Sequence, residues 1–104
     1  MMKGMGDLVR QAQVMQNKIT KMQEEVGKRT VEAAAGGGMV TVTANGAQEI
    51  LAVKIDPAVV NADDLEMLQD LVLAAVNEAL KKAGEMMKQE MAQITGGIKI
   101  PGMF

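Results

Sequence analysis

Carboxylates are the side chains best suited to chemistry here, because the chain has no His, Cys, Ser, Tyr or Trp. That composition removes the usual nucleophiles, the proton carrier of neutral pH and the soft metal ligands. The densest acidic group comprises Asp63, Asp64, Glu66 and Asp70. Glu66 and Asp70 share one helix face that a hard cation could use, but acids also collect at helix N-termini to complement the helix dipole. No second acidic cluster faces them in the pattern, so we favour the helix-terminus interpretation and expect no enzyme, metal or cofactor.

Two other patterns could mark binding sites. The run Gly36-Gly37-Gly38 could cradle a phosphate, but it lacks the Lys-Ser/Thr of a P-loop and joins two predicted strands. A flexible hairpin turn is the better interpretation. Met86, Met87 and Met91 could line an adaptable groove, although methionines at helical spacing more often pack against a neighbouring helix. Neither pattern predicts a small-molecule substrate.

Positive charge is concentrated in the first third of the chain. Residues 1–29 carry six bases against three acids, whereas residues 30–70 carry one base against seven acids, within a total charge of −2. A segregated charge can bind an anionic partner even when the whole chain is acidic. Exposed bases on helices suit phosphate contacts, with a merely solvated face as the alternative. The candidate nucleic-acid-binding residues are Lys3, Arg10, Lys18, Lys21, Lys28, Arg29, Lys81, Lys82 and Lys88.

A helix over about residues 6–29 must position the first of these bases. Its apolar residues, from Leu8 to Val26, recur in steps of four and three, which is the spacing of a coiled-coil seam. Asp7 suits the helix start, and Gly27 followed by Lys28 and Arg29 suits its end. In heptad numbering Lys3 and Arg10 fall at f, Lys21 and Lys28 at c, and Lys18 at g, all off the seam. The seam is short for a free coiled coil, so we expect it to pack inside the protein.

The middle of the chain predicts a three-stranded antiparallel meander. Residues 30–35, 39–44 and 47–55 read as strands, with Leu51, Val53 and Ile55 on one face of the third. Asn45-Gly46 is the strongest two-residue hairpin signal, because both turn positions need positive φ. Asp56-Pro57 ends the third strand, with Asp capping a helical turn.

A long helix over about residues 63–94 should follow, capped by Asn61 or Asp63. Its wide apolar surface, with one stripe ending in Ala75 and Ala79 and an adjacent one containing Ala83, suggests contact with two surfaces, such as the sheet and a partner helix. Gly84 would either permit a close crossing or weaken the helix. We expect residues 96–104 to form a flexible tail.

The whole chain reads as one domain, residues 1–104, of α/β (α+β) class. Its core is thin, because it contains many alanines and no interior aromatic, so an oligomer would supply missing burial. The absence of Cys suits a reducing cytoplasm. We expect a cytosolic protein with no membrane partner, since no stretch has the uncharged length of a membrane span.

Five stretches in this order resemble one family. They are residues 11–25, Val40 to Gly46, Val53 to Pro57, Glu66 to Ala79, and the Gly96-Gly97 and Pro101-Gly102 tail. Together they are similar to the YbaB/EbfC family of bacterial nucleoid-associated proteins, over nearly the whole chain. The resemblance implies a tweezer-like homodimer that binds duplex DNA in the nucleoid, changes its conformation with little sequence specificity, and contributes to nucleoid organisation and gene regulation. It places the DNA contacts broadly on the two helices.

Two rival functions remain open from the residues. A protein-interaction adaptor would use the heptad seam and the methionine-rich helix to bind a partner, leaving the bases for solubility. An RNA-binding protein would differ from a DNA-binding one only in competition experiments. The lack of aromatic residues argues against readers of single strands that stack bases.

Overall fold

The computed structural model describes residues 2–96, and their side chains from residue 4 onward. The predicted order of helix, meander and long helix is confirmed, and the fold is α+β. The predicted flexible tail lies outside the described residues except for Gly96, which caps the last helix in a left-handed conformation. The elements are α1 (Met2–Lys28), β1 (Thr30–Ala35), β2 (Val40–Asn45), β3 (Ile50–Ile55), a short 3-10 helix η1 (Pro57–Val59) and α2 (Leu65–Thr95).

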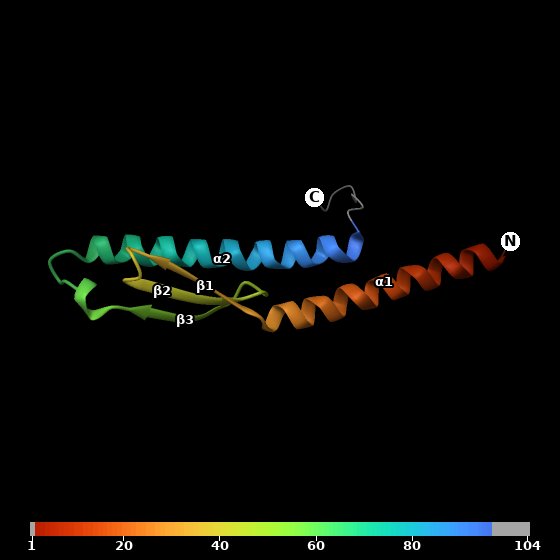
Figure 1. Ribbon diagram of the computed structural model, residues 1–104, viewed down its shortest axis with the longest axis horizontal. Helices are drawn as coiled ribbons and strands as arrows, with labels where there is room; N and C mark the ends of the chain where they lie inside the picture. Colours follow the sequence, from red (N-terminus) through yellow and green to blue (C-terminus); the bar gives the residue numbers. More distant parts are fainter. Residues whose placement is uncertain (1, 97–104) are drawn as a thin grey trace.

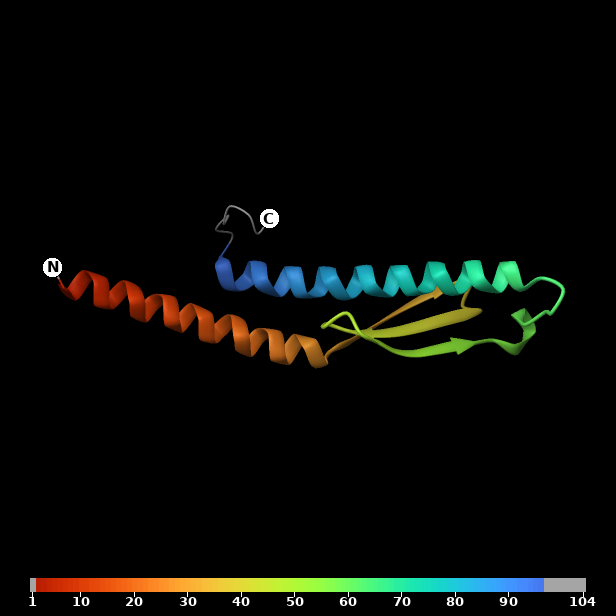
Figure 2. The same ribbon diagram turned by 180° about the vertical axis from the view of Figure 1, so that it is seen from behind.

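The three strands form one antiparallel sheet in the order β1-β2-β3, with α2 running along one face (Figures 1 and 2). Val42 in the central strand pairs with Ala33 on one side and with Val53 on the other. Residues of β2 alternate, so Val40, Val42 and Ala44 point toward α2 and are fully buried. The helix covers β1 and β2 far more than β3, every residue of which is exposed.

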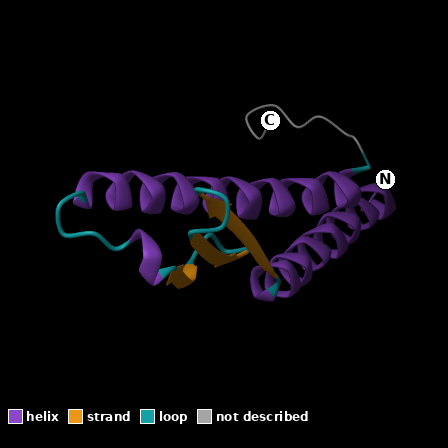
Figure 3. Ribbon diagram, turned by 60° about the vertical axis from the view of Figure 1, so that its left-hand side comes forward, coloured by secondary structure: helices purple, strands orange, loops and turns teal. Residues whose placement is uncertain are grey.

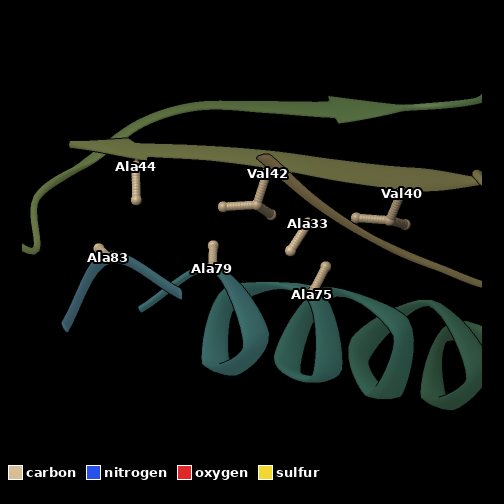
Figure 4. Packing of buried hydrophobic residues seen from close by; sticks show 7 residues of the cluster. All are labelled: Ala33, Val40, Val42, Ala44, Ala75, Ala79 and Ala83. Carbon is tan, nitrogen blue, oxygen red and sulfur yellow. The ribbon is translucent and has the colours of Figure 1, made fainter. Parts of the chain in front are cut away.

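Alanines on α2 complete this core. Ala75, Ala79 and Ala83 are four residues apart, so they share one helix face, and none is accessible to solvent. Figure 4 shows them facing the valines and alanines of the sheet. Their small side chains let the helix lie close to β2. Ala83 therefore lies on the same face as Ala75 and Ala79, and its assignment to the second predicted stripe is wrong. The predicted contact of α2 with two surfaces is confirmed, because α2 contacts both the sheet and α1.

The first helix projects from this body. It lies antiparallel to the last turns of α2 and then continues past the end of that helix (Figures 1 and 3). The molecule consequently measures 75 × 23 × 16 Å. Its predicted start at residue 6 is wrong, because the helix begins at Met2 and includes Gly4 and Gly6. Glycine weakens a helix by about 1 kcal/mol without preventing helical geometry.

The apolar seam of α1 is covered only near its C-terminal end. Met22 and Val26 are buried, but Leu8 is 67% and Met15 36% exposed. The predicted packing of the whole seam inside the protein is therefore wrong for its N-terminal half. The reason is geometric, since α2 ends before it reaches that half of α1.

Asn45-Gly46 predicts a two-residue turn, but the β2–β3 hairpin is closed by a hydrogen bond from Asn45 N to Glu49 O at 3.0 Å, which encloses a loop of three residues, 46–48. Gln48 N donates to Asn45 O at 2.9 Å, and Gln48, not Asn45 or Gly46, takes positive φ, at 61°. Asn45 holds this loop by accepting backbone hydrogen bonds from Ala47 and Glu49, both at 3.0 Å. Gly46 is needed for another reason, because a Cβ there would collide with the backbone carbonyl of Val26 in α1.

Two further predictions shift by one residue. Between Thr43 and Ala44 the pairing with β3 slips, so that Ile50 rather than Leu51 pairs with Ala44 and lies on the same face as Val53 and Ile55. Asp64, not Asn61 or Asp63, caps α2 by accepting from Met67 N at 3.2 Å. The helical turn after β3 is confirmed.

Candidate nucleic-acid interface

A line of bases follows the outer side of α1. Arg10, Lys21 and Lys28 are separated by about three and two helical turns, so they share one face within roughly 20°. All three side chains are exposed. Lys3 precedes Arg10 by about two helical turns and so lies on nearly the same side of α1. Its side chain lies outside the described residues. We call Arg10, Lys21 and Lys28 the basic face of α1.

The heptad numbering divides these residues between two positions. An ideal α-helix returns to nearly the same angle after eleven residues, whereas a heptad repeat does not. Because most of α1 does not pack in a coiled coil, Arg10 and Lys21 lie on one face of the helix. Arg10 and Lys28 are then about 27 Å apart along the axis.

The charges of the basic face are only loosely paired. Arg10 Nη2 lies 3.8 Å from Asp7 Oδ1, and both side chains are more than three-fifths exposed. Such an exposed pair contributes about 0–1 kcal/mol and is easily exchanged for another anion. The guanidinium of Arg10 therefore remains available to a phosphate.

Lys18 and Lys21 border a shallow groove between the two helices. The groove has a volume of about 330 Å³ and is also lined by Met22, Glu25 and Ile94. Lys18 thus lies on the flank of α1, next to the basic face but closer to α2. Glu25 reduces the positive charge at the end of this groove, so Lys21 has both a basic and an acidic neighbour.

Two predicted DNA-binding residues instead make contacts within the chain. Arg29 Nη1 donates to Glu90 Oε1 at 3.0 Å and thereby joins the end of α1 to α2. Lys82 Nζ donates to the backbone carbonyl of Glu32 at 2.9 Å and joins α2 to β1. Both side chains hold elements together, which explains their position without any external anion.

Lys81 and Lys88 lie elsewhere. They are about two turns apart on α2, on the face opposite its buried alanines. The sheet and α1 are both on the other side of α2 (Figures 1 and 3). The structure therefore does not bring Lys81 and Lys88 onto one surface with the basic face of α1 within a single chain.

An apolar groove on the other half of the molecule was not predicted. It lies between β3 and the first half of α2, with a volume of about 460 Å³. Leu73 is 60% exposed, and its apolar side chain on α2, which we did not assign to a predicted stripe, was a sequence signal for this surface. The lining residues, which we call the β3–α2 groove, are Ile55, Leu68, Gln69, Val72, Leu73 and Val76.

The acidic residues at the start of α2 are not gathered into one cluster. Within residues 2–96, no three acidic side chains gather in a group that could hold a metal ion. Asp64 instead accepts the hydrogen bond that caps the helix. Over the same residues, no helix combines the length and the apolar character needed to cross a membrane.

Comparison with known protein families gives one match over most of the chain. Residues 2–98 match the family described as the YbaB/EbfC DNA-binding family.

Individual relatives agree with this match. A nucleoid-associated protein of Moorella thermoacetica is 58% identical over 101 residues, covering 97% of both chains. A nucleoid-associated protein of Thermoanaerobacter sp. strain X514 is 58% identical over 98 residues, covering 94% of this chain and 88% of its own. The crystal structure of an uncharacterized protein from Helicobacter pylori superposes with a TM-score of 0.75 at 26% identity, covering 86% of this chain and 94% of that one.

Proposed function

Because the chain belongs to the YbaB/EbfC DNA-binding family, we propose that it is a nucleoid-associated protein that binds duplex DNA through backbone phosphates as a homodimer. The observation that carries this proposal is the basic face of α1. Three bases, Arg10, Lys21 and Lys28, lie in a line on the exposed side of a projecting helix. A line of positive charge without a fixed pattern of amides or aromatics suits phosphates rather than base edges.

The dimensions of α1 support contact with a duplex. Its 27 residues span about 40 Å, and the interval from Arg10 to Lys28 approaches one turn of B-DNA, about 34 Å. A contact of this kind would not depend on sequence. The protein would bind DNA in the nucleoid, in the cytoplasm. By changing the shape of the duplex there, it would contribute to nucleoid organisation and gene regulation.

The β3–α2 groove supports the homodimer. Ile55 and Leu73 on its two sides are 40% and 60% exposed, while Leu68, Val72 and Val76 between them are only half-buried by the core. Contiguous apolar surface of this kind marks an interaction site more often than a solvated face. A second copy placed there would also double the number of basic α1 faces and so increase the affinity for one duplex through avidity.

The experiment that tests DNA binding is fluorescence anisotropy of a labelled duplex at several salt concentrations. The variant combining Arg10→Glu, Lys18→Glu and Lys21→Glu should bind all duplex sequences more weakly. Its log–log salt dependence should become less steep by about 0.9 for each phosphate that the variant no longer neutralises. Unchanged affinity of this variant would refute binding through α1.

A matched pair of single changes controls for total charge. Lys21→Glu alters the basic face, whereas Lys54→Glu makes the same change of charge on β3. Only the first should weaken binding substantially. Absent or salt-insensitive binding of the unchanged protein would favour the protein-interaction adaptor, and displacement of DNA by a structured RNA at equal concentration would favour RNA.

A further inference from the structure

The N-terminal half of α1 carries an apolar strip that no described residue buries. Met5 and Leu8 are each 67% exposed, and Met15 is 36% exposed. Ala12, between Leu8 and Met15, keeps the spacing of three and four and is also exposed. We call Met5, Leu8, Ala12 and Met15 the free seam of α1. Exposed apolar residues that line up in this way mark an interaction site.

The spacing of the free seam indicates which kind of surface fits it. Apolar residues at steps of three and four insert between the side chains of a second helix that has the same spacing. The described part of the chain buries this spacing only farther along α1, at Met22 and Val26. A second copy of α1 carries the same exposed seam, so the two seams match each other.

Charge allows the two seams to meet in the antiparallel direction. In an antiparallel pair with the seam at heptad positions a and d, Leu8 of one copy lies beside Ala12 of the other. Met5 lies beside Met15 in the same register. Gln11 of one copy meets Gln11 of the other at one edge, and no charged residue occupies either edge of this overlap. Like charges therefore do not oppose the contact.

The direction of α1 keeps this overlap clear of the rest of the described chain. Ile94, in the last turn of α2, lines a groove with Lys18 and Met22 of α1. Helix α1 continues past this point, away from the sheet (Figure 1). Two α1 helices can therefore overlap over residues 5–15, with the two sheets at opposite ends of the pair. The β3–α2 groove then remains free for a different copy.

We propose that the free seam of α1 pairs with the free seam of a second copy in the antiparallel direction, in a contact separate from the β3–α2 groove. The overlap is about 15 Å long and a helix is about 10 Å wide, so the contact is much smaller than the roughly 800 Å² per partner of a stable interface. The pair is consequently weak in dilute solution. It forms extensively where copies are held close together, because their effective concentration is then high.

Pairing through the seam turns the basic faces of the two copies outward. At about 100° per residue, Arg10, Lys21 and Lys28 lie roughly 160–180° around α1 from the middle of the free seam. In the antiparallel pair the two basic faces therefore point in opposite directions. This last step rests on the proposed function, because each face then binds its own duplex and the pair holds two duplexes together.

Cross-linking of the full-length protein tests the pair directly, because the chain contains no cysteine of its own. Gln11→Cys places a thiol at the edge of the pair opposite its equivalent, whereas Asn17→Cys places one on the side away from the seam. A short bis-maleimide should join two Gln11→Cys chains, with a yield that rises several-fold when a long duplex is added. Asn17→Cys chains should stay unlinked. Equal yields from the two variants would overturn the proposal.

The same reagent tests the direction of the pair. A parallel pair would place Gln11 beside Gln16 of the second copy and would keep the two Gln11 side chains apart. Cross-links that require a mixture of Gln11→Cys and Gln16→Cys chains would therefore refute the antiparallel arrangement.

Two neutral changes in the Gln11→Cys protein show whether the seam itself is the contact. Leu8→Gln with Met15→Gln removes apolar surface at exposed positions without altering charge, and it should lower the cross-linking yield to that of Asn17→Cys. Val14→Gln should leave the yield intact, since Val14 is 48% exposed and lies toward the basic face. Circular dichroism checks that the helices are retained in both. An equal loss of yield in both variants would contradict the assignment of the seam.

Capture of a labelled duplex by beads that carry an unlabelled duplex tests the joining of two duplexes. The unchanged protein should retain the labelled duplex. The variant Leu8→Gln with Met15→Gln should lose most of this capture while keeping its affinity for a short single duplex in fluorescence anisotropy. Full capture by this variant would refute joining through the seam. Cross-linking without any DNA binding would instead refute the proposed function and leave the α1 pair in place.

Discussion

Arg29 lies 3.0 Å from Glu90, and this ion pair joins the residue that follows α1 to the last part of α2. The side chain of Glu90 is only 24% exposed, whereas that of Arg29 is 51% exposed. Because the pair is partly shielded from water, it is better placed to fix the two helices than the exposed pair of Asp7 and Arg10. The pair therefore bears on stability and, through the position of α1, on the proposed binding of DNA.

Neutralising Arg29 and Glu90 separately and together should reveal a coupling of about 0.5–1 kcal/mol in the free energy of unfolding. Urea denaturation of Arg29→Gln, Glu90→Gln, the double variant and the unchanged protein measures it. Glu90→Gln should also tighten DNA binding more than Glu66→Gln, which removes the same charge without releasing an arginine. Additive effects on stability would show that the pair contributes nothing.

Gly46→Ala should destabilise the protein by about 1–3 kcal/mol, because the new methyl group would collide with the carbonyl of Val26. Gly27→Ala is the matched control near the same junction. Its methyl group would meet only Ala47 Cβ, at 3.9 Å, within a helix that prefers alanine. This control should stabilise the protein by up to about 1 kcal/mol. Thermal unfolding distinguishes the two, and a shift of the same sign in both would contradict the geometry.

Gly84 provides space for the side chain of Gln48. A Cβ on Gly84 would lie 2.9 Å from Gln48 Nε2, which donates to Leu80 O at 3.2 Å. Gly84→Ala should thus be close to neutral, since a helix gain of about 1 kcal/mol offsets the loss of a hydrogen bond of about the same value. In a Gln48→Gly background the full gain should appear. Urea denaturation of the four proteins measures this coupling, which independent sites would not show.

Leu73→Asp should weaken the proposed dimer without unfolding the chain, because Leu73 is 60% exposed. A charge in the β3–α2 groove would lose its water when a second copy binds. Met67→Asp places the same charge on α2, on the side away from the groove, and should leave association unchanged. Sedimentation velocity over a range of concentrations compares the two. A Leu73→Asp protein that associates like the unchanged one would exclude this groove as the dimer interface.

Much of the fold could be predicted because local signals agreed with the tertiary contacts. The strand predicted at residues 39–44 shows Val40 and Val42 alternating with threonines, as a half-buried strand should, and Asp56-Pro57 defined the turn after β3. The buried stripe of α2 was only partly predicted. Alanine has almost no hydrophobic signature, so the stripe ending in Ala83 emerged only once the helix was placed on the sheet.

The remaining errors come from contacts between distant segments. Asn45-Gly46 satisfies the local rule for a two-residue turn, but the approach of Val26 restricts Gly46, and the positive φ falls on Gln48 instead. The ion pair between Arg29 and Glu90 was missed because the two residues are 61 positions apart in the sequence, and the contact of Arg29 with DNA stays a prediction. Opposite charges that far apart cannot be paired from one sequence. The sequence placed the bases of α1 on exposed positions. That Arg10, Lys21 and Lys28 share one face followed only from the 3.6-residue repeat of the observed helix, because heptad numbering separates Arg10 from the other two.

Helix α1 is packed against the rest of the described chain only near its C-terminal end, so a rotation about that end moves its other end. Its buried contacts, Met22 and Val26, lie within the last two turns, while Arg10 is about 27 Å from Lys28. A pivot of about 10° at that end would displace Arg10 by about 5 Å. That displacement exceeds the rise between neighbouring phosphates of one DNA strand, about 3.4 Å along the duplex axis. In the proposed complex with DNA, small changes near Arg29 would thereby change the phosphate that Arg10 reaches.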